Sequence, residues 1–344
     1  IACATAEQIA VFDISAGKIA SRIEVPASPS GLALSPDGTR LYVTCAAPQS
    51  LIAVIDVVSG KVTRRFRARH TAMAPVPSPD GKRLYVCNRF NNSVSAYDTQ
   101  TGKEILSVAV AREPVAAALT PDGRLLFVAN HLHTGRADAD VVAAEVSVVD
   151  TAAGKEIKRI PLPNGSSLLR GVCISPDGKY VCVTHVLARF HLPTTQLERG
   201  WMNTSGLSLI DVGKMKLVNT VLLDNVDSGA ANPWAVAWTG DGKFICATHA
   251  GTKEMSVIDA GALLAKLAKL PESLELARTP DYSSATRVAA DVPNDLAFLV
   301  GVRKRIKLEG HGPRALAFAG KKAYAANYFS DSLGVVDLEA TNAL

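Results

Sequence analysis

Ser35-Pro36-Asp37-Gly38 stands between two short apolar runs, at residues 31–34 and 41–43. Proline followed by Asp-Gly favours a tight hairpin turn, and β-branched and aromatic residues around it favour strands. The same turn recurs at residues 78–81, 120–123 and 175–178, with a variant at 239–242. The chain is therefore predicted to repeat one antiparallel unit.

A third strand follows the hairpin in each repeat and ends in an aspartate, which we expect to cap the next turn. Seven such aspartates occur: Asp13, Asp56, Asp98, Asp150, Asp211, Asp259 and Asp337. Most are followed by a Gly-Lys turn and a more polar fourth strand. A four-stranded meander cannot bury both of its faces alone, so the copies must pack around an axis. The sequence predicts an all-β, seven-bladed propeller.

The second strands carry a further signature. They read Tyr42-Val43-Thr44-Cys45, Tyr85-Val86-Cys87-Asn88, Phe127-Val128-Ala129-Asn130 and Tyr324-Ala325-Ala326-Asn327. This pattern resembles the YVTN β-propeller repeat family over nearly the whole chain, and the resemblance implies the fold but not the function. The first copy opens in its second strand and the last stops after its third, so we expect a longer polypeptide.

The sequence predicts one domain over residues 1–344, with insertions at 131–145, 186–205 and 260–302. In the third insertion, leucines at helical spacing up to Pro271 predict a short helix in the sixth blade. A second helix is expected from Asn294 or Asp295 through Leu299. No apolar run is long enough to span a membrane.

Composition narrows the classes of function. The net charge of +5 is mild, and its densest part, at residues 64–69, suggests a solvated strand face, so we expect no nucleic-acid partner. None of the six cysteines has the C-x-x-C-H spacing that attaches a haem. No catalytic Ser-His-Asp pattern or phosphate-binding glycine loop appears, which leaves hydrolase and nucleotide chemistry without support.

Antiparallel order places the end of each second strand, the start of each third, the end of each fourth and the start of each first on one side of the ring, here called the top face. All seven histidines fall there. The first hypothesis is a docking module that presents this face to a protein or to a small ligand. The candidate binding residues are Arg136, Asp138, Asp140, Arg170, Arg189, Arg199, Trp201, Asn232, Trp234 and Arg314.

A closer resemblance sharpens this hypothesis. Residues 135–142, 184–190, 196–203, 232–234 and 328–332 resemble the propeller part of exported bacterial fusion proteins with a di-haem, cytochrome c peroxidase or MauG-like domain. The resemblance implies a periplasmic or cell-surface location and a c-type cytochrome partner. Haem is then expected only in a fused or partner domain, which would follow Leu344.

The alternative hypothesis is a metal-dependent oxidoreductase. His131, His185, His249 and His311 would converge on a copper, iron, nickel or zinc ion, since imidazole suits these metals. Simpler structural interpretations stand beside both hypotheses. His185 and His249 could hydrogen-bond loop backbone, and Asp138 and Asp140 could pair with Arg136. The sequence leaves open whether the chain is itself an enzyme.

Overall fold

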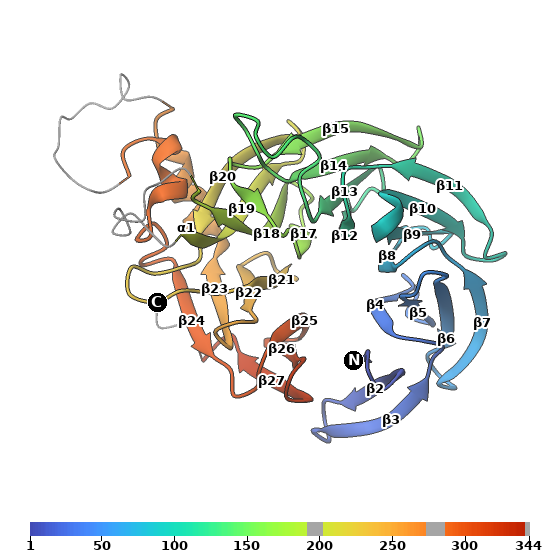
Figure 1. Cartoon of the computed structure of the whole chain (residues 1–344). Helices are drawn as coiled ribbons and strands as arrows, with labels where there is room; N and C mark the ends of the chain where they lie inside the picture. The colour runs from blue at the N-terminus through green and yellow to red at the C-terminus, as the bar shows by residue number, and fades with distance from the viewer. Residues whose placement is uncertain (191–201, 273–285, 341–344) are drawn as a thin grey trace. The chain divides into compact units, whose positions relative to one another are not determined.

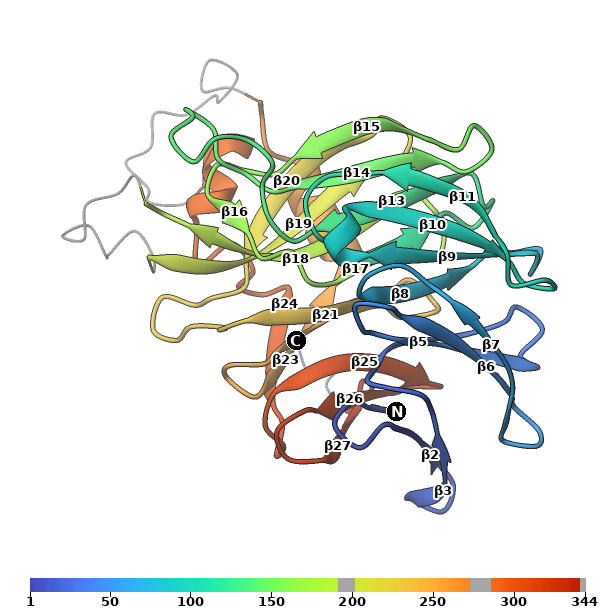
Figure 2. The same ribbon diagram turned by 45° about the vertical axis from the view of Figure 1, so that its right-hand side comes forward.

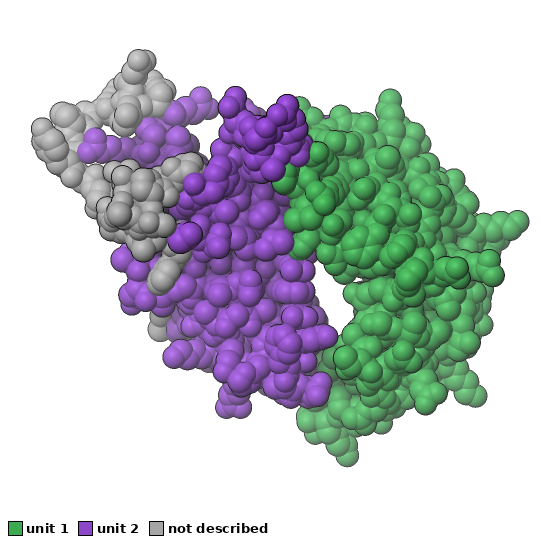
Figure 3. Space-filling model, viewed as in Figure 1, with its two compact units in different colours: residues 1–134, 145–159 green, residues 135–144, 160–344 purple. Residues whose placement is uncertain are grey.

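A computed structural model of the chain describes residues 1–190, 202–272 and 286–340. These residues form seven antiparallel sheets that follow one another along the chain (Figures 1 and 2). The predicted all-β fold with seven blades is confirmed. Two compact units divide the chain, residues 1–134 with 145–159 and residues 135–144 with 160–344 (Figure 3).

The first four sheets use strands β1 to β15. The first sheet has three strands, because the chain enters it at the second position of the repeat. The sheets are β1 (Ala2–Cys3), β2 (Gln8–Asp13), β3 (Lys18–Glu24); β4 (Pro29–Leu34), β5 (Arg40–Cys45), β6 (Leu51–Asp56), β7 (Lys61–Arg67); β8 (Ala72–Pro77), β9 (Arg83–Asn88), β10 (Ser93–Asp98), β11 (Glu104–Ala109); and β12 (Pro114–Leu119), β13 (Leu125–Asn130), β14 (Glu145–Asp150), β15 (Lys155–Pro161). A 3-10 turn, η1 (Arg89–Asn91), joins β9 to β10.

The last three sheets belong to the second unit. The fifth has its first strand split into two pieces that both pair with β18, and the seventh ends after its third strand. They are β16 (Ser166–Ser167), β17 (Val172–Ile174), β18 (Tyr180–Ala188), β19 (Asn203–Asp211), β20 (Lys216–Leu222); β21 (Pro233–Trp238), β22 (Phe244–His249), β23 (Glu254–Asp259), β24 (Arg303–Lys307); and β25 (Pro313–Ala319), β26 (Lys322–Asn327), β27 (Ser332–Asp337).

The recurring hairpin turn is held by its own side chains. Ser35 Oγ donates to Asp37 Oδ1 at 2.5 Å and accepts the N–H of Arg40 at 2.9 Å. Gly38 has a φ of +70°, a left-handed conformation that glycine adopts without steric cost. Ser35, Asp37 and Gly38 therefore each have a separate role in reversing the chain.

The strand-ending aspartates cap the turns that follow them, as predicted. Asp56 Oδ1 accepts the N–H of Ser59 at 2.8 Å, and Asp98 Oδ1 accepts the N–H of Thr101 at 2.6 Å. In the sixth sheet the same position caps a helix instead, because Asp259 Oδ1 accepts the N–H of Ala262 at 2.8 Å. One aspartate position thus serves two kinds of connection.

The predicted helix in the sixth blade is confirmed as α1 (Ala260–Ala268), between β23 and β24. Leu263 and Leu267 are buried in a cluster with apolar residues of the fifth and sixth sheets. Among the described residues no helix has the length and apolar character needed to cross a bilayer.

The second expected helix is absent from residues 295–299. A 3-10 helix, η4 (Ala289–Asn294), lies before them. The carboxylate of Asp295 accepts the N–H of Ala297 at 2.8 Å and the hydroxyl of Thr286 at 2.5 Å, which favours a turn over a helix. The prediction was wrong because Phe298 and Leu299 reach the core from this turn and need no helical spacing.

Asp259→Ala is expected to lower the free energy of unfolding by about 1 kcal/mol, because α1 loses its N-cap. Asp259→Ser, which keeps an oxygen acceptor at the cap, is expected to lose much less. Urea unfolding of both variants measures the difference. Equal losses for the two variants would show that the cap has no part in the stability.

Candidate functional site

Asn130, His185 and His249 each stand at the fourth position of a second-strand signature, and each forms a hydrogen bond inside its own sheet. Asn130 Nδ2 donates to Ser147 Oγ at 2.9 Å. His185 Nε2 lies 2.8 Å from Ser208 Oγ, and His249 Nε2 lies 2.8 Å from Ser256 Oγ. The histidines therefore occupy the structural place of the asparagines and pair with a serine of the neighbouring strand. His185 Nδ1 also lies 3.2 Å from the carbonyl oxygen of Val186, so a backbone contact, which the sequence interpretation expected, is present beside the serine.

Burial keeps both of these imidazoles neutral. Desolvation lowers the pKa of His185 to about 4. It also lowers the pKa of His249 to about 3, with a smaller contribution from the positive charges of Arg305 and Arg303. Neither side chain is exposed.

The described residues give no support to the predicted convergence of four histidines on a metal ion. Across residues 1–190, 202–272 and 286–340, no three His, Cys, Asp or Glu side chains gather into a group that could hold a metal. His131 is buried, and its backbone N–H donates to the carbonyl of Glu113. His311 is exposed and its Nε2 accepts from Lys253 Nζ at 3.3 Å. His185 and His249 instead turn into their own sheets, where each pairs with a serine.

Three other predicted residues do come together, at the starts of the first strands in the second unit. The guanidinium carbon of Arg170 lies 4.0 Å from the centre of the Trp234 ring, and that of Arg314 lies 4.3 Å from it. Such stacking combines cation–π attraction with burial of the arginine stems. All three side chains are half-buried.

Two exposed aromatic residues complete this group. The guanidinium carbon of Arg314 lies 4.0 Å from the ring centre of Tyr328 and 4.9 Å from that of Phe329. Tyr328 is 45% exposed and Phe329 is 67% exposed. We name Arg170, Trp234, Arg314, Tyr328 and Phe329 the cationic–aromatic cluster. Arg314 is its centre, since its charge touches three rings.

Local backbone geometry explains how these side chains meet. Asn232 and Gly312 have left-handed φ values of 56° and 69°, each directly before the proline that begins a first strand. A Cβ on Gly312 would lie 2.5 Å from the Phe329 ring, and one on Gly171 would lie 2.5 Å from the carbonyl of Trp234. Only glycine allows these close approaches. Asn232, a predicted binding residue, is exposed, and its left-handed conformation is one that asparagine favours.

The predicted residues of the insertions lie apart from the cluster's contacts. Arg136 and Asp138 form an exposed ion pair, and this pairing lowers the pKa of the Asp138 carboxyl. The carbonyl of Asp140 accepts from Asn164. Arg189 is buried and donates to the Asn294 side chain and the Pro293 carbonyl, at 2.5 and 2.6 Å, so it anchors η4. Arg199 and Trp201 lie outside the described residues.

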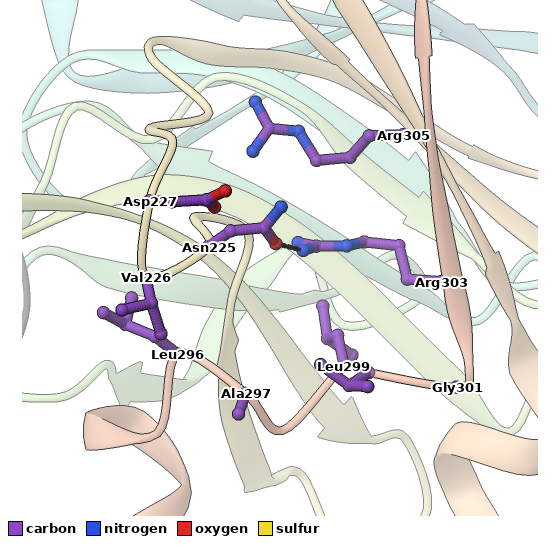
Figure 4. Close-up of a pocket in the computed structure, with 10 residues that line it drawn as sticks. Asn225, Val226, Asp227, Leu296, Ala297, Leu299, Gly301, Arg303 and Arg305 are labelled. Carbon is purple, nitrogen blue, oxygen red and sulfur yellow. Dashed lines mark hydrogen bonds between the residues drawn. The ribbon is translucent and has the colours of Figure 1, made fainter.

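A cavity of about 390 Å³ lies beside β24, at residues that the sequence interpretation did not single out. Arg303 and Arg305 extend from β24 toward the loop of Asn225 and Asp227, and Leu299 lies on another side (Figure 4). Arg303 donates to the Leu223 carbonyl at 2.5 Å and to the Asn225 side chain. Burial lowers its pKa to about 10.

Arg305 also forms its hydrogen bonds and its ion pair within the chain. It donates to the carbonyls of Ser228 and Gly229, at 2.9 and 2.6 Å, and forms an ion pair with Glu254. Nearby, burial raises the pKa of the Asp224 carboxyl, which accepts the N–H groups of Ser205 and Ala230. The two arginines of β24 therefore hold the loop that follows β20. We interpret the cavity beside them as a consequence of this structural role.

Sequence reasoning did not name Tyr328 and Phe329 as site residues, nor Lys253, which lies outside the cluster and contacts His311. The signal for the first two was present, since two consecutive aromatic residues follow the second-strand signature in the turn after β26. No pattern marked Lys253, which reaches His311 only because adjacent sheets bring their loops together.

Comparison with known proteins finds a sequence relative. No family model matches the chain. The chain is 27% identical over 194 residues to hydrazine synthase subunit beta of Kuenenia stuttgartiensis. The match covers 56% of this chain and 46% of that protein, so the chain aligns with less than half of the relative's length.

The likeness in three dimensions is more extensive. The solved structure of Kuenenia stuttgartiensis hydrazine synthase contains a chain that superposes with a TM-score of 0.83, covering 96% of this chain and 89% of that one. Sequence identity over the superposition is 24%, so the likeness speaks for the fold alone. The chain is a seven-bladed β-propeller with the fold of a chain of hydrazine synthase, and it is similar in sequence to the beta subunit.

Proposed function

We propose that the chain is a binding subunit that docks a c-type cytochrome domain through the cationic–aromatic cluster. The observation that carries this proposal is the Arg314 guanidinium, surrounded by three rings of which two are exposed. Arginine and aromatic residues dominate the energetics of protein interfaces. The similar protein is named as a subunit, which supports a role within an assembly.

The redox chemistry of the proposed assembly lies in the partner. The sequence has no C-x-x-C-H motif to attach a haem, and its resemblance to the propeller part of cytochrome fusion proteins supplies the class of partner. The same resemblance supports a periplasmic or cell-surface location. The propeller would contribute a rigid surface that fixes the orientation of the cytochrome. A small ligand could also bind at the same face.

Isolation of the native assembly tests this function. The chain, tagged in its source organism and purified at low salt, is expected to bring down a protein with covalently attached haem from the extracytoplasmic fraction. Tyr328→Ala/Phe329→Ala is expected to lose that protein, whereas Phe190→Ala, an exposed aromatic outside the cluster, should keep it. Recovery of the chain alone, of a haem-free partner, or of the same complex from both variants would contradict the proposal.

A further inference from the structure

Arg314 differs from Arg189, Arg303 and Arg305 of the second unit in its hydrogen bonds. Arg189, Arg303 and Arg305 each donate to at least two oxygens of the protein. Arg314 has no hydrogen bond or ion pair within the described part of the chain, and its Nε is buried without a partner. A guanidinium carries five N–H donors, and leaving a buried donor unpaired is costly.

The rings around Arg314 stabilise its positive charge, but they do not accept hydrogen bonds from its N–H groups. Trp234, Tyr328 and Phe329 lie within 4.9 Å of the guanidinium carbon and attract it through their π faces. Guanidinium N–H groups point outward in the plane of the group, where a planar acceptor can bind two of them at once. The arrangement therefore stabilises a cation while its hydrogen-bonding edge is left for an acceptor.

Two further cations, Arg170 and Lys253, lie at the strand starts and loops around Arg314. Arg170 stacks on the same indole, and Lys253 contacts His311, one position before Gly312 at the start of β25. No acidic side chain forms an ion pair with Arg314 or Lys253 among the residues the structure describes. Cations that have no ion-paired carboxylate attract an anionic partner and repel a cationic one.

We propose that Arg314 anchors a carboxylate from an acidic segment of the protein partner. The carboxylate would accept two N–H groups of Arg314, and the apolar residue beside it would pack on Tyr328 and Phe329. Charge complementarity favours an acidic segment over other occupants, and the exposed rings favour a peptide over a free ion. This inference rests on the proposed function and names the chemistry that the partner must present.

Two matched peptides test the carboxylate. Acetyl-Leu-Glu-Glu-Leu-amide is titrated into the full chain with ¹⁵N-labelled arginine, and acetyl-Leu-Gln-Gln-Leu-amide is titrated in parallel. The glutamate peptide is expected to shift the Nε–H signal of Arg314 and to bind at least about tenfold more tightly than the glutamine peptide. Its affinity should fall with added salt. Equal binding of the two peptides, or binding of neither, overturns the inference.

Variants assign the effect to one residue. Arg314→Gln is expected to weaken binding of the glutamate peptide by about tenfold, and Arg314→Lys, which keeps the charge but not the two-pronged geometry, by less. Arg136→Gln serves as the control, because that arginine pairs with Asp138 on an exposed loop. Unchanged binding to Arg314→Gln, with its thermal unfolding intact, would refute the anchor. Peptide binding without a haem-bearing partner would refute the proposed function and leave the anchor standing.

Discussion

When the pH falls from 7 to 5, the free energy of unfolding of the natural protein is expected to fall. In the double variant His185→Asn/His249→Asn this fall is expected to be about 4 kcal/mol smaller. Burial lowers the pKa of His185 to about 4 and that of His249 to about 3, against 6.5 for a free histidine. Below pH 6.5 the unfolded chain takes up a proton at each imidazole and the folded chain does not. The contribution of each neutral histidine to the free energy of unfolding is therefore fully present above pH 6.5. Below that pH it declines by about 1.4 kcal/mol per pH unit for each group, until the pKa of the folded state is reached.

Asparagine is the matched replacement, because Asn130 makes the equivalent hydrogen bond to Ser147 in the fourth sheet. Urea unfolding at pH 7 and at pH 5 gives the loss for each protein. His311→Asn, at an exposed position, is the control and should follow the natural protein. If the double variant loses as much stability as the natural protein, the two histidines do not cause its acid sensitivity.

The fold could be predicted from sequence because each blade carries its own local signals. The turn at residues 35–38 and the aspartate at the end of each third strand act through hydrogen bonds only two to five residues away. Such short-range interactions are visible in a single sequence. The helix α1 was predictable for the same reason, whereas η4 depends on the side chain of Arg189, about a hundred residues earlier.

The serine partners of His185 and His249 could have been predicted by comparing the repeats of the sequence with one another. Wherever the fourth signature position is Asn88, Asn130, His185 or His249, a serine stands three residues before the strand-ending aspartate. These are the serines that accept or donate the buried hydrogen bond. That these residues occur in pairs indicates a structural contact between neighbouring strands. The pairing can be recognised in the sequence once the repeats are aligned with one another.

The cluster could be predicted only as a set of positions. Strand order places Arg170, Trp234 and Arg314 at the same end of three successive sheets, which the sequence established. Their stacking depends on Gly171 and Gly312, where close approach of backbone to a carbonyl or a ring is a matter of tertiary packing. Repeat position predicts which end of a blade a residue occupies, but not which neighbour it touches.

Arg305→Met is expected to lower the free energy of unfolding by about 3–5 kcal/mol. The Arg305 and Glu254 side chains are only 10% and 13% exposed, so the variant leaves a buried carboxylate without its cation. It also removes the donors to the carbonyls of Ser228 and Gly229, which hold the loop after β20. Loss of a positive charge should raise the pKa of His249 as well, since Arg305 contributes to its lowering.

A double-mutant cycle separates the ion pair from simple packing. Arg305→Met/Glu254→Met removes both charges, and it is expected to recover most of the loss, because a buried ion pair replaced by apolar side chains of similar volume is close to neutral. The comparison pair is Arg136 and Asp138, 83% and 68% exposed, where Arg136→Met should leave the stability unchanged within error. A double variant as unstable as Arg305→Met would mean that the loop carbonyls, and not the charge of Glu254, require the arginine. In that case the cavity beside β24 should open, and native-state hydrogen exchange at residues 223–229 would rise in both variants alike.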